Sequence, residues 1–208
     1  MERQKVLILG DSFLNRLRKA IVLKKDIKFD LNLNLVEDRV IWYARGGLTL
    51  EKLHRDDNDH VRGVERLGPF TAAVLCIDSN DLCKRTVEDV MAVMQSETIP
   101  WLQSLGCLAV CITKLFYRRP GDYTRGLDLG RYNAKVDDFN NKLATSTVTM
   151  GPHSLVTFWD NRDVLQSGKV GKIWDEDGVH LNADGHPCLA KSLRGAVMTT
   201  LKLVRRYV

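Results

Sequence analysis

The stretch VLILGDS, residues 6–12, decides the predicted fold class. Its apolar run, Val6–Leu9, has the length and composition of a buried β-strand. Gly10 ends this run, and an amphipathic helical pattern over Phe13–Leu23 begins directly after Ser12. A strand that passes through a short turn into a helix is the building unit of parallel α/β sheets.

The same alternation of short apolar runs and longer amphipathic segments continues along the chain. Further strand-like runs cover Leu35–Tyr43, Ala72–Ile77, Leu108–Thr113 and Leu155–Phe158. Helical patterns cover Thr49–His54, Val87–Leu105, Arg131–Ala144 and Ala183–Val204, and Pro100 predicts a kink or break near Ile99. Near-continuous apolar strands are typical of sheets buried on both faces. The sequence therefore predicts an α/β fold, a three-layer α/β/α sandwich around a central, mainly parallel five-stranded sheet, in a single domain over residues 1–208.

Composition and charge restrict the classes of protein that remain. The net charge of +5 is spread along the chain, which favours solvated surfaces over a nucleic-acid interface, although attraction to nucleic acid stays open. The number of cysteines is odd at five, and three of them lie in or beside apolar runs, which indicates a reducing compartment. The first residues lack the shape of a signal peptide, and no window reaches the ~18 apolar residues of a membrane span. We therefore expect an intracellular, cytoplasmic protein without a transmembrane segment.

Ser12 is the first candidate for chemistry. In an open parallel sheet, ligands bind at the carboxyl ends of the strands, and Ser12 follows such an end directly. The amino terminus of the following helix would stabilise negative charge there, which suits a nucleophile. The equally simple alternative is that Ser12 only caps the helix.

Asp177 and His180 form a second candidate pair, three residues apart and just before the last helical pattern. A turn of this length can aim both side chains in one direction. The carboxylate would then fix the tautomer of the imidazole and stabilise its protonated form. The alternative is a surface turn with a capping role.

Two further strand ends carry residues that could stabilise a developing oxyanion. Asn80 follows the run Ala72–Ile77, and its side-chain amide could donate a hydrogen bond. Gly46 and Gly47 follow the second strand, where glycine permits close backbone approach and leaves an N–H group to donate. A plain polar turn is the alternative at Asn80.

Taken together, these segments resemble the SGNH hydrolases, also called GDSL-like lipases and esterases. Gly10-Asp11-Ser12 matches the first block of that superfamily, Gly47 the second and Asn80-Asp81 the third. Residues 177–182, DGVHLN, closely match the last block, so the resemblance covers essentially the whole chain. The third block usually begins with glycine, and here Asp78 stands in that position.

The resemblance implies a flavodoxin-like sheet and a serine esterase that needs no metal or organic cofactor. Ser12 would be the nucleophile, His180 the base and Asp177 its partner. The backbone N–H groups of Ser12 and Gly47 and the side chain of Asn80 would form the oxyanion hole. The expected substrate is a small-molecule ester with a small, acetyl-type acyl group on a lipid or a sugar.

Asp78, after the third strand, and Arg118 and Arg119, in the loop of residues 117–130, could contact the substrate. A solvated loop is the equally simple alternative for the two arginines. The extra carboxylate of Asp78 also permits an alternative function, a binding module that keeps the fold with weak or no catalysis. Such domains occur in retroelement proteins, where association with lipid or nucleic acid would be the role. The sequence does not fix the oligomeric state.

Overall fold

The computed structural model describes residues 4–24, 27–33, 39–55, 59–77, 79–146, 155–161, 164 and 171–207. One five-stranded sheet forms its centre, with the strands in the order β2-β1-β3-β4-β5 and every pairing parallel. The strands are β1 (Lys5–Gly10), β2 (Arg39–Ala44), β3 (Ala72–Cys76), β4 (Ala109–Thr113) and β5 (Leu155–Trp159). This is the flavodoxin-like strand order, and it confirms the predicted fold class.

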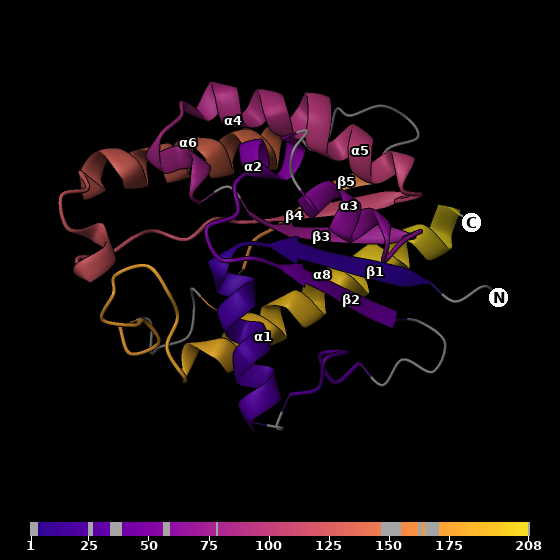
Figure 1. The fold of residues 1–208 in the computed structure, drawn as a ribbon, viewed down its shortest axis with the longest axis horizontal. Coiled ribbons are helices and arrows are strands. Elements are labelled where there is room, and N and C mark those ends of the chain that lie inside the picture. The colour runs from indigo at the N-terminus through magenta and orange to yellow at the C-terminus, as the bar shows by residue number, and fades with distance from the viewer. Residues whose placement is uncertain are drawn as a thin grey trace.

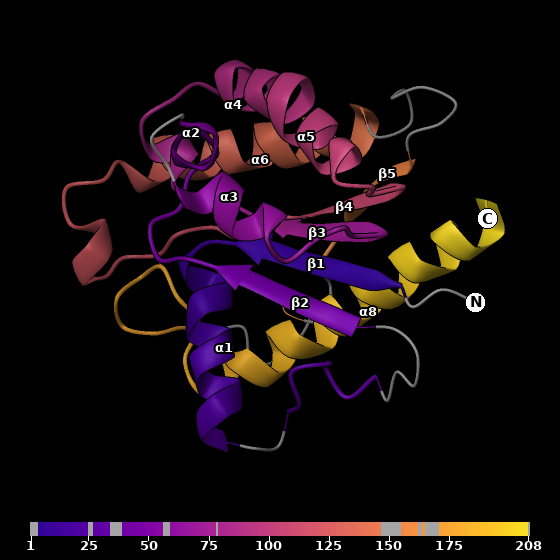
Figure 2. The same ribbon diagram turned by 45° about the vertical axis from the view of Figure 1, so that its right-hand side comes forward.

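Helices cover both faces of the sheet and complete a three-layer sandwich (Figure 1). One face carries α1 (Ser12–Lys24) and α8 (Gly185–Tyr207), and α8 crosses beneath the strands (Figure 2). The other face carries α2 (Leu50–His54), α3 (Asp59–Glu65), α4 (Val87–Val93), α5 (Ile99–Ser104) and α6 (Leu129–Ser146). Among the described residues, none of these helices combines the length and apolar character needed to cross a bilayer.

The run in β1 is apolar throughout because its side chains pack alternately into two hydrophobic cores, one on each face of the sheet. Leu7 and Leu9 point into the core under α2–α6, whereas Val6 and Ile8 point into the core under α1 and α8. All four are fully buried. Successive side chains of a strand alternate between faces, so burial on both faces requires a continuous apolar run.

The helical segment that contains Pro100 is irregular where the sequence predicts a kink or break near Ile99. A π-helical turn, η2 (Met94–Thr98), separates α4 from α5 there, and α5 begins at Ile99. Pro100 lies in the first turn of α5, where its missing N–H group costs little. Helix α3 was not predicted at all. Strand β2 begins at Arg39 and contains the second half of the predicted strand Leu35–Tyr43, whose residues 35–38 lie outside the described residues.

The carboxyl ends of β1 and β3 lie next to each other at the point where the strand order reverses, which is the usual ligand site of such sheets. Gly10 ends β1 there, and a Cβ atom on it would come within 2.3 Å of the Cys76 carbonyl oxygen. Because glycine lacks this atom, the Asp11 N–H group can donate to that oxygen at 3.2 Å. This close approach brings Ser12 beside the residues that follow β3.

Candidate active site

Ser12 is the first residue of α1, and its side chain does not cap the helix. Instead, Asp11 Oδ1 accepts a hydrogen bond from the Phe13 N–H group at 3.0 Å. The interpretation of Ser12 as a helix cap is therefore wrong. With Asp11 in the capping position, the Ser12 hydroxyl is available for another partner.

That partner is His180, which the fold brings to Ser12 from the far end of the chain. The distance between His180 Nε2 and Ser12 Oγ is 2.7 Å. On the other side of the imidazole, Nδ1 lies 2.7 Å from Asp177 Oδ2. Ser12, His180 and Asp177 thus form one continuous row of hydrogen bonds, with His180 only 6% exposed.

The loop that carries Asp177 and His180 is fixed by its own backbone. Asp177 Oδ1 accepts from the N–H groups of Val179 and His180, each at 2.8 Å. The Asp175 N–H group donates to the His180 carbonyl at 2.8 Å, and Trp174 pairs with Leu181 in an antiparallel bridge. One oxygen of Asp177 therefore shapes the turn while the other faces the imidazole.

The loop that leads from β4 to α6 packs against the turn that carries Asp177 and His180, and is hydrogen-bonded to it. The Arg119 N–H group donates to the Gly178 carbonyl at 2.8 Å, and the Tyr123 N–H group donates to the Asp177 carbonyl at 3.1 Å. A Cβ atom on Gly121 would come within 2.3 Å of the backbone of Asp177 and Gly178. Gly178 itself has a φ of +77° and equally little room. We call this contact between the backbones at Gly121 and Gly178 the glycine clamp.

The electrostatic environment suits a base at neutral pH. Burial lowers the pKa of His180 below its ordinary 6.5, and the charge of Arg16 acts in the same direction, against the hydrogen bond to Asp177. Burial alone would raise the pKa of Asp177, but the backbone donors and His180 outweigh it, so this pKa lies below 3.8. At neutral pH the imidazole is therefore uncharged and the carboxylate is ionised.

Arg16 is a site residue that the sequence analysis missed. Its guanidinium donates to Asp175 Oδ2 at 3.0 Å and lies 2.9 Å from Asp177 Oδ2. Arg16 stands four residues after Ser12, one helical turn along the same face of α1, and this spacing was the available signal. The ion pair holds the 174–182 loop against α1.

Asn80 lies at the predicted strand end, but its amide is already bonded. Its Nδ2 donates to the Leu48 carbonyl at 3.2 Å and to Asp11 Oδ2 at 3.4 Å, and its Oδ1 accepts from Arg118 Nη2 at 3.3 Å. Ser79 Oγ donates to the same Asp11 oxygen at 2.8 Å. Burial raises the pKa of Asp11 to about 6, although the bonds from Ser79 and from the backbone favour its charged form.

Ser12, His180, Gly47, Asn80 and Arg118 line one cavity of about 420 Å³. Gly47 has a φ of +68°, which favours glycine at this position, and its carbonyl accepts from Lys52 Nζ at 2.8 Å. The cavity wall also includes the aromatic ring of Tyr123, centred 6.0 Å from the imidazole of His180.

The other two predicted substrate contacts are not among the residues that line this cavity. Arg119 lies with its guanidinium 5.1 Å from the ring centre of Trp174. Asp78 lies outside the described residues.

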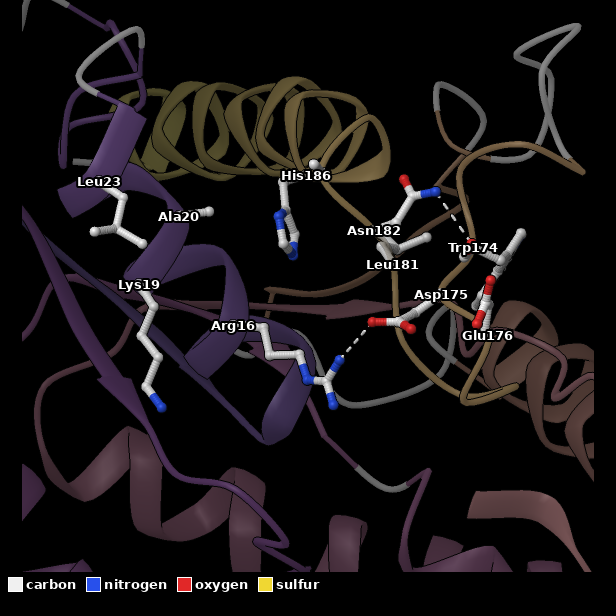
Figure 3. A pocket seen from close by; sticks show the side chains of 11 residues that line it. Arg16, Lys19, Ala20, Leu23, Trp174, Asp175, Glu176, Leu181, Asn182 and His186 are labelled. Atoms are coloured by element: carbon white, nitrogen blue, oxygen red, sulfur yellow. Dashed lines mark hydrogen bonds and ion pairs between the residues drawn. The ribbon is translucent and has the colours of Figure 1, made fainter. Parts of the chain in front are cut away.

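A larger cavity of about 620 Å³ adjoins the first one on the outer side of α1. Figure 3 shows Leu23, Ala20 and Lys19 of α1 along one side and Trp174, Leu181 and His186 along the other. Arg16 and Lys19 line both cavities, so they form the boundary between them. Arg16 points across this boundary to Asp175 (Figure 3).

Comparison with solved structures finds the same fold in proteins described as SGNH hydrolases and esterases. A proposed SGNH hydrolase from Slackia heliotrinireducens is 15% identical, covers 94% of this chain and 100% of its own, and superposes with a TM-score of 0.68. A serine-to-alanine mutant of an acetyl esterase, solved with an acetate ion, is 15% identical over 99% of this chain and 100% of its own, with a TM-score of 0.64. A carbohydrate esterase of family 3 from Talaromyces cellulolyticus is 16% identical over 98% and 99%, with a TM-score of 0.62. No family model and no curated protein sequence matches the chain.

Proposed function

We propose that the protein is a serine esterase that hydrolyses esters of small, acetyl-type acyl groups. The observation that carries this proposal is the hydrogen-bonded row from Ser12 through His180 to Asp177, in which Ser12 and His180 line a cavity. A nucleophile bonded to a base, with the base oriented by a third group, is the arrangement that acyl transfer needs. Solved structures with this fold include an acetyl esterase and an acetyl xylan esterase.

In the proposed reaction, Ser12 Oγ attacks the ester carbonyl carbon while His180 Nε2 takes its proton. The resulting oxyanion is held by the backbone N–H groups of Ser12 and Gly47 and by the amide of Asn80, whose present bonds of 3.2 and 3.4 Å are long enough to be exchanged for a stronger acceptor. His180 then gives the proton to the departing alkoxide. A water molecule releases the acid from Ser12 by the same steps.

Polar and charged side chains in the cavity wall support a preference for small acyl groups. Asn15, Arg16, Lys19, Asn80 and Arg118 are all polar or charged, and a long apolar chain would lie against them unfavourably. The more apolar cavity lies behind Arg16, whose guanidinium is bound to Asp175 and Asp177.

A series of p-nitrophenyl esters tests this proposal, with Ser12→Ala as the blank. We expect kcat/KM to be highest for the acetate and to fall at least about tenfold towards the octanoate. Higher kcat/KM for the octanoate would contradict the preference for small acyl groups. Equal rates for the wild type and Ser12→Ala on every ester would contradict the proposed esterase activity. Saturable binding of a glycan or lipid without turnover would then favour a binding module.

The glycine clamp gives a second expected result. In Gly121→Ala the new methyl group meets the backbone of Asp177 and Gly178, so the turn that carries His180 must shift. A displacement of about 1 Å at a reacting group can cost roughly 100-fold, and we expect such a loss in kcat/KM for p-nitrophenyl acetate. Gly130→Ala is the matched control, because the nearest atom to its Cβ is 3.5 Å away on a side chain. Equal activity of the two variants would show that the clamp does not position His180.

A further inference from the structure

A third cavity, of about 420 Å³, lies beside the catalytic one and is lined mainly by charged side chains. Five of them are cations, namely Lys52, Arg55, Lys84, Arg85 and Arg118. They come from α2, from the turn between η1 (Asp81–Cys83) and α4, and from the loop after β4. Segments far apart in the sequence thus place positive charge around one space.

The carboxylates of this cavity do not balance its cations. Glu51 is paired with Arg55, and its hydrogen bond to that guanidinium lowers its pKa. Asp81 is 2% exposed and is turned inward, where its Oδ2 accepts from the Leu50 N–H group at 3.1 Å. Within the described part of the chain, neither Lys84 nor Arg85 forms an ion pair with a carboxylate. Among the described residues that line this cavity, cationic side chains therefore outnumber carboxylates.

The opposite side of the catalytic cavity is different. There, the charge of Arg16 is balanced by Asp175 and Asp177, and Figure 3 shows its guanidinium directed at Asp175. The excess of cations is thus specific to the side of Arg118 and Arg85.

This third cavity, which we call the cationic cavity, adjoins the catalytic one. Gly47, Asn80 and Arg118 line both cavities. In the proposed mechanism, Gly47 and Asn80 donate hydrogen bonds to the oxyanion. An ester bound at Ser12 would therefore lie next to the cationic cavity.

We propose that this cavity, lined by Lys84, Arg85 and Arg118, is a subsite for a phosphate group carried by the ester substrate. This substrate class rests on the proposed esterase function. Guanidinium groups bind phosphate oxygens through paired, charge-assisted hydrogen bonds, and lysine adds a compact charge. A doubly charged phosphate would form ion pairs with these cations, whereas a neutral ester would not.

The test compares two acetate esters that differ by one phosphate group on the aryl ring, phenyl acetate and 4-acetoxyphenyl phosphate. In the double variant Lys84→Ala/Arg85→Ala, we expect the ratio of kcat/KM for the phosphorylated ester to that for the neutral ester to fall about tenfold or more. The control Arg194→Ala/Lys202→Ala removes the same charge from exposed positions of α8, outside both cavities, and should keep the wild-type ratio. An unchanged ratio in the Lys84/Arg85 variant, or an equal fall in the control, would overturn the subsite.

Binding of inorganic phosphate, followed by titration calorimetry, separates this proposal from the esterase proposal because it needs no turnover. We expect phosphate to bind the wild type and the α8 control alike, and the Lys84/Arg85 variant at least about tenfold more weakly. If no ester is hydrolysed but this pattern appears, the esterase proposal fails and the anion site stands. If esters are hydrolysed but phosphate binds all three proteins equally, the subsite fails. Vesicles that contain phosphatidic acid, used in place of phosphate, distinguish a lipid headgroup from a soluble substrate.

Discussion

Replacing Ser12 with alanine is expected to lower kcat for p-nitrophenyl acetate by roughly 10⁴–10⁶-fold while leaving the protein folded. The loss is large because the nucleophile is removed and His180 no longer has a proton to accept. The fold should persist because the cap of α1 is supplied by Asp11. Rates on the acetate, together with circular dichroism of both proteins, measure the two parts of this prediction.

Covalent labelling provides an independent measurement of the same residue. A fluorophosphonate should label the wild type at Ser12 and leave Ser12→Ala unlabelled. Ser96→Ala, which changes an exposed serine of η2, should be labelled as fast as the wild type. Undiminished labelling of Ser12→Ala would show that the reactive serine lies elsewhere.

Replacing Asp177 with asparagine is expected to lower kcat by about 10⁴-fold. Asp177 Oδ1 accepts two backbone N–H groups, so the oxygen of an asparagine must take that position. Its NH₂ group then faces His180 Nδ1, which has to become an acceptor. The imidazole proton moves to Nε2, and His180 can no longer take the proton of Ser12.

Asp175→Asn is the matched control for this prediction. Asp175 bonds the same Arg16 but does not contact the imidazole, so we expect a loss of less than about tenfold. Measurements at pH 7–8 are suitable, because the lowered pKa of His180 keeps the wild-type imidazole uncharged there. Equal losses in the two variants would mean that Asp177 acts only as part of the ion pair and not through His180.

The sheet could be predicted because its strands are encoded locally. The continuous apolar run of β1 reflects burial on both faces, and Gly10 marks its end. Helix α3 could not be predicted in the same way. Its seven residues, Asp59–Glu65, bury only Val64 among them, so no periodic apolar pattern marks it. We infer that contacts with the rest of the fold, rather than a local sequence pattern, make this segment helical.

The row Ser12–His180–Asp177 could be anticipated because strand ends in a parallel sheet meet at one edge. The supporting contacts could not. The bond from Arg118 to Asn80 depends on how the loop after β4 folds back, and the contact of Arg16 with Asp175 joins residues 159 positions apart. The spacing of Arg16 from Ser12 places it on the right face of α1, but the sequence does not indicate its partner, and the bond from Arg118 leaves no local signal. The glycine clamp could not be anticipated either, because the need for glycine at Gly121 comes from the backbone of Asp177 and Gly178 that packs against it.

The hydrogen bond between Ser12 and His180 links residues separated by 168 positions, with strands β2 to β5 between them in the sequence. Contacts of such long range form late in folding, because the entropy of closing the intervening chain must first be offset by other contacts. During synthesis, the nucleophile would therefore emerge long before its base and stay inert. Recovery of fluorophosphonate labelling after dilution from denaturant should accordingly lag behind recovery of helical circular dichroism, which makes reactivity at Ser12 a report on completed folding.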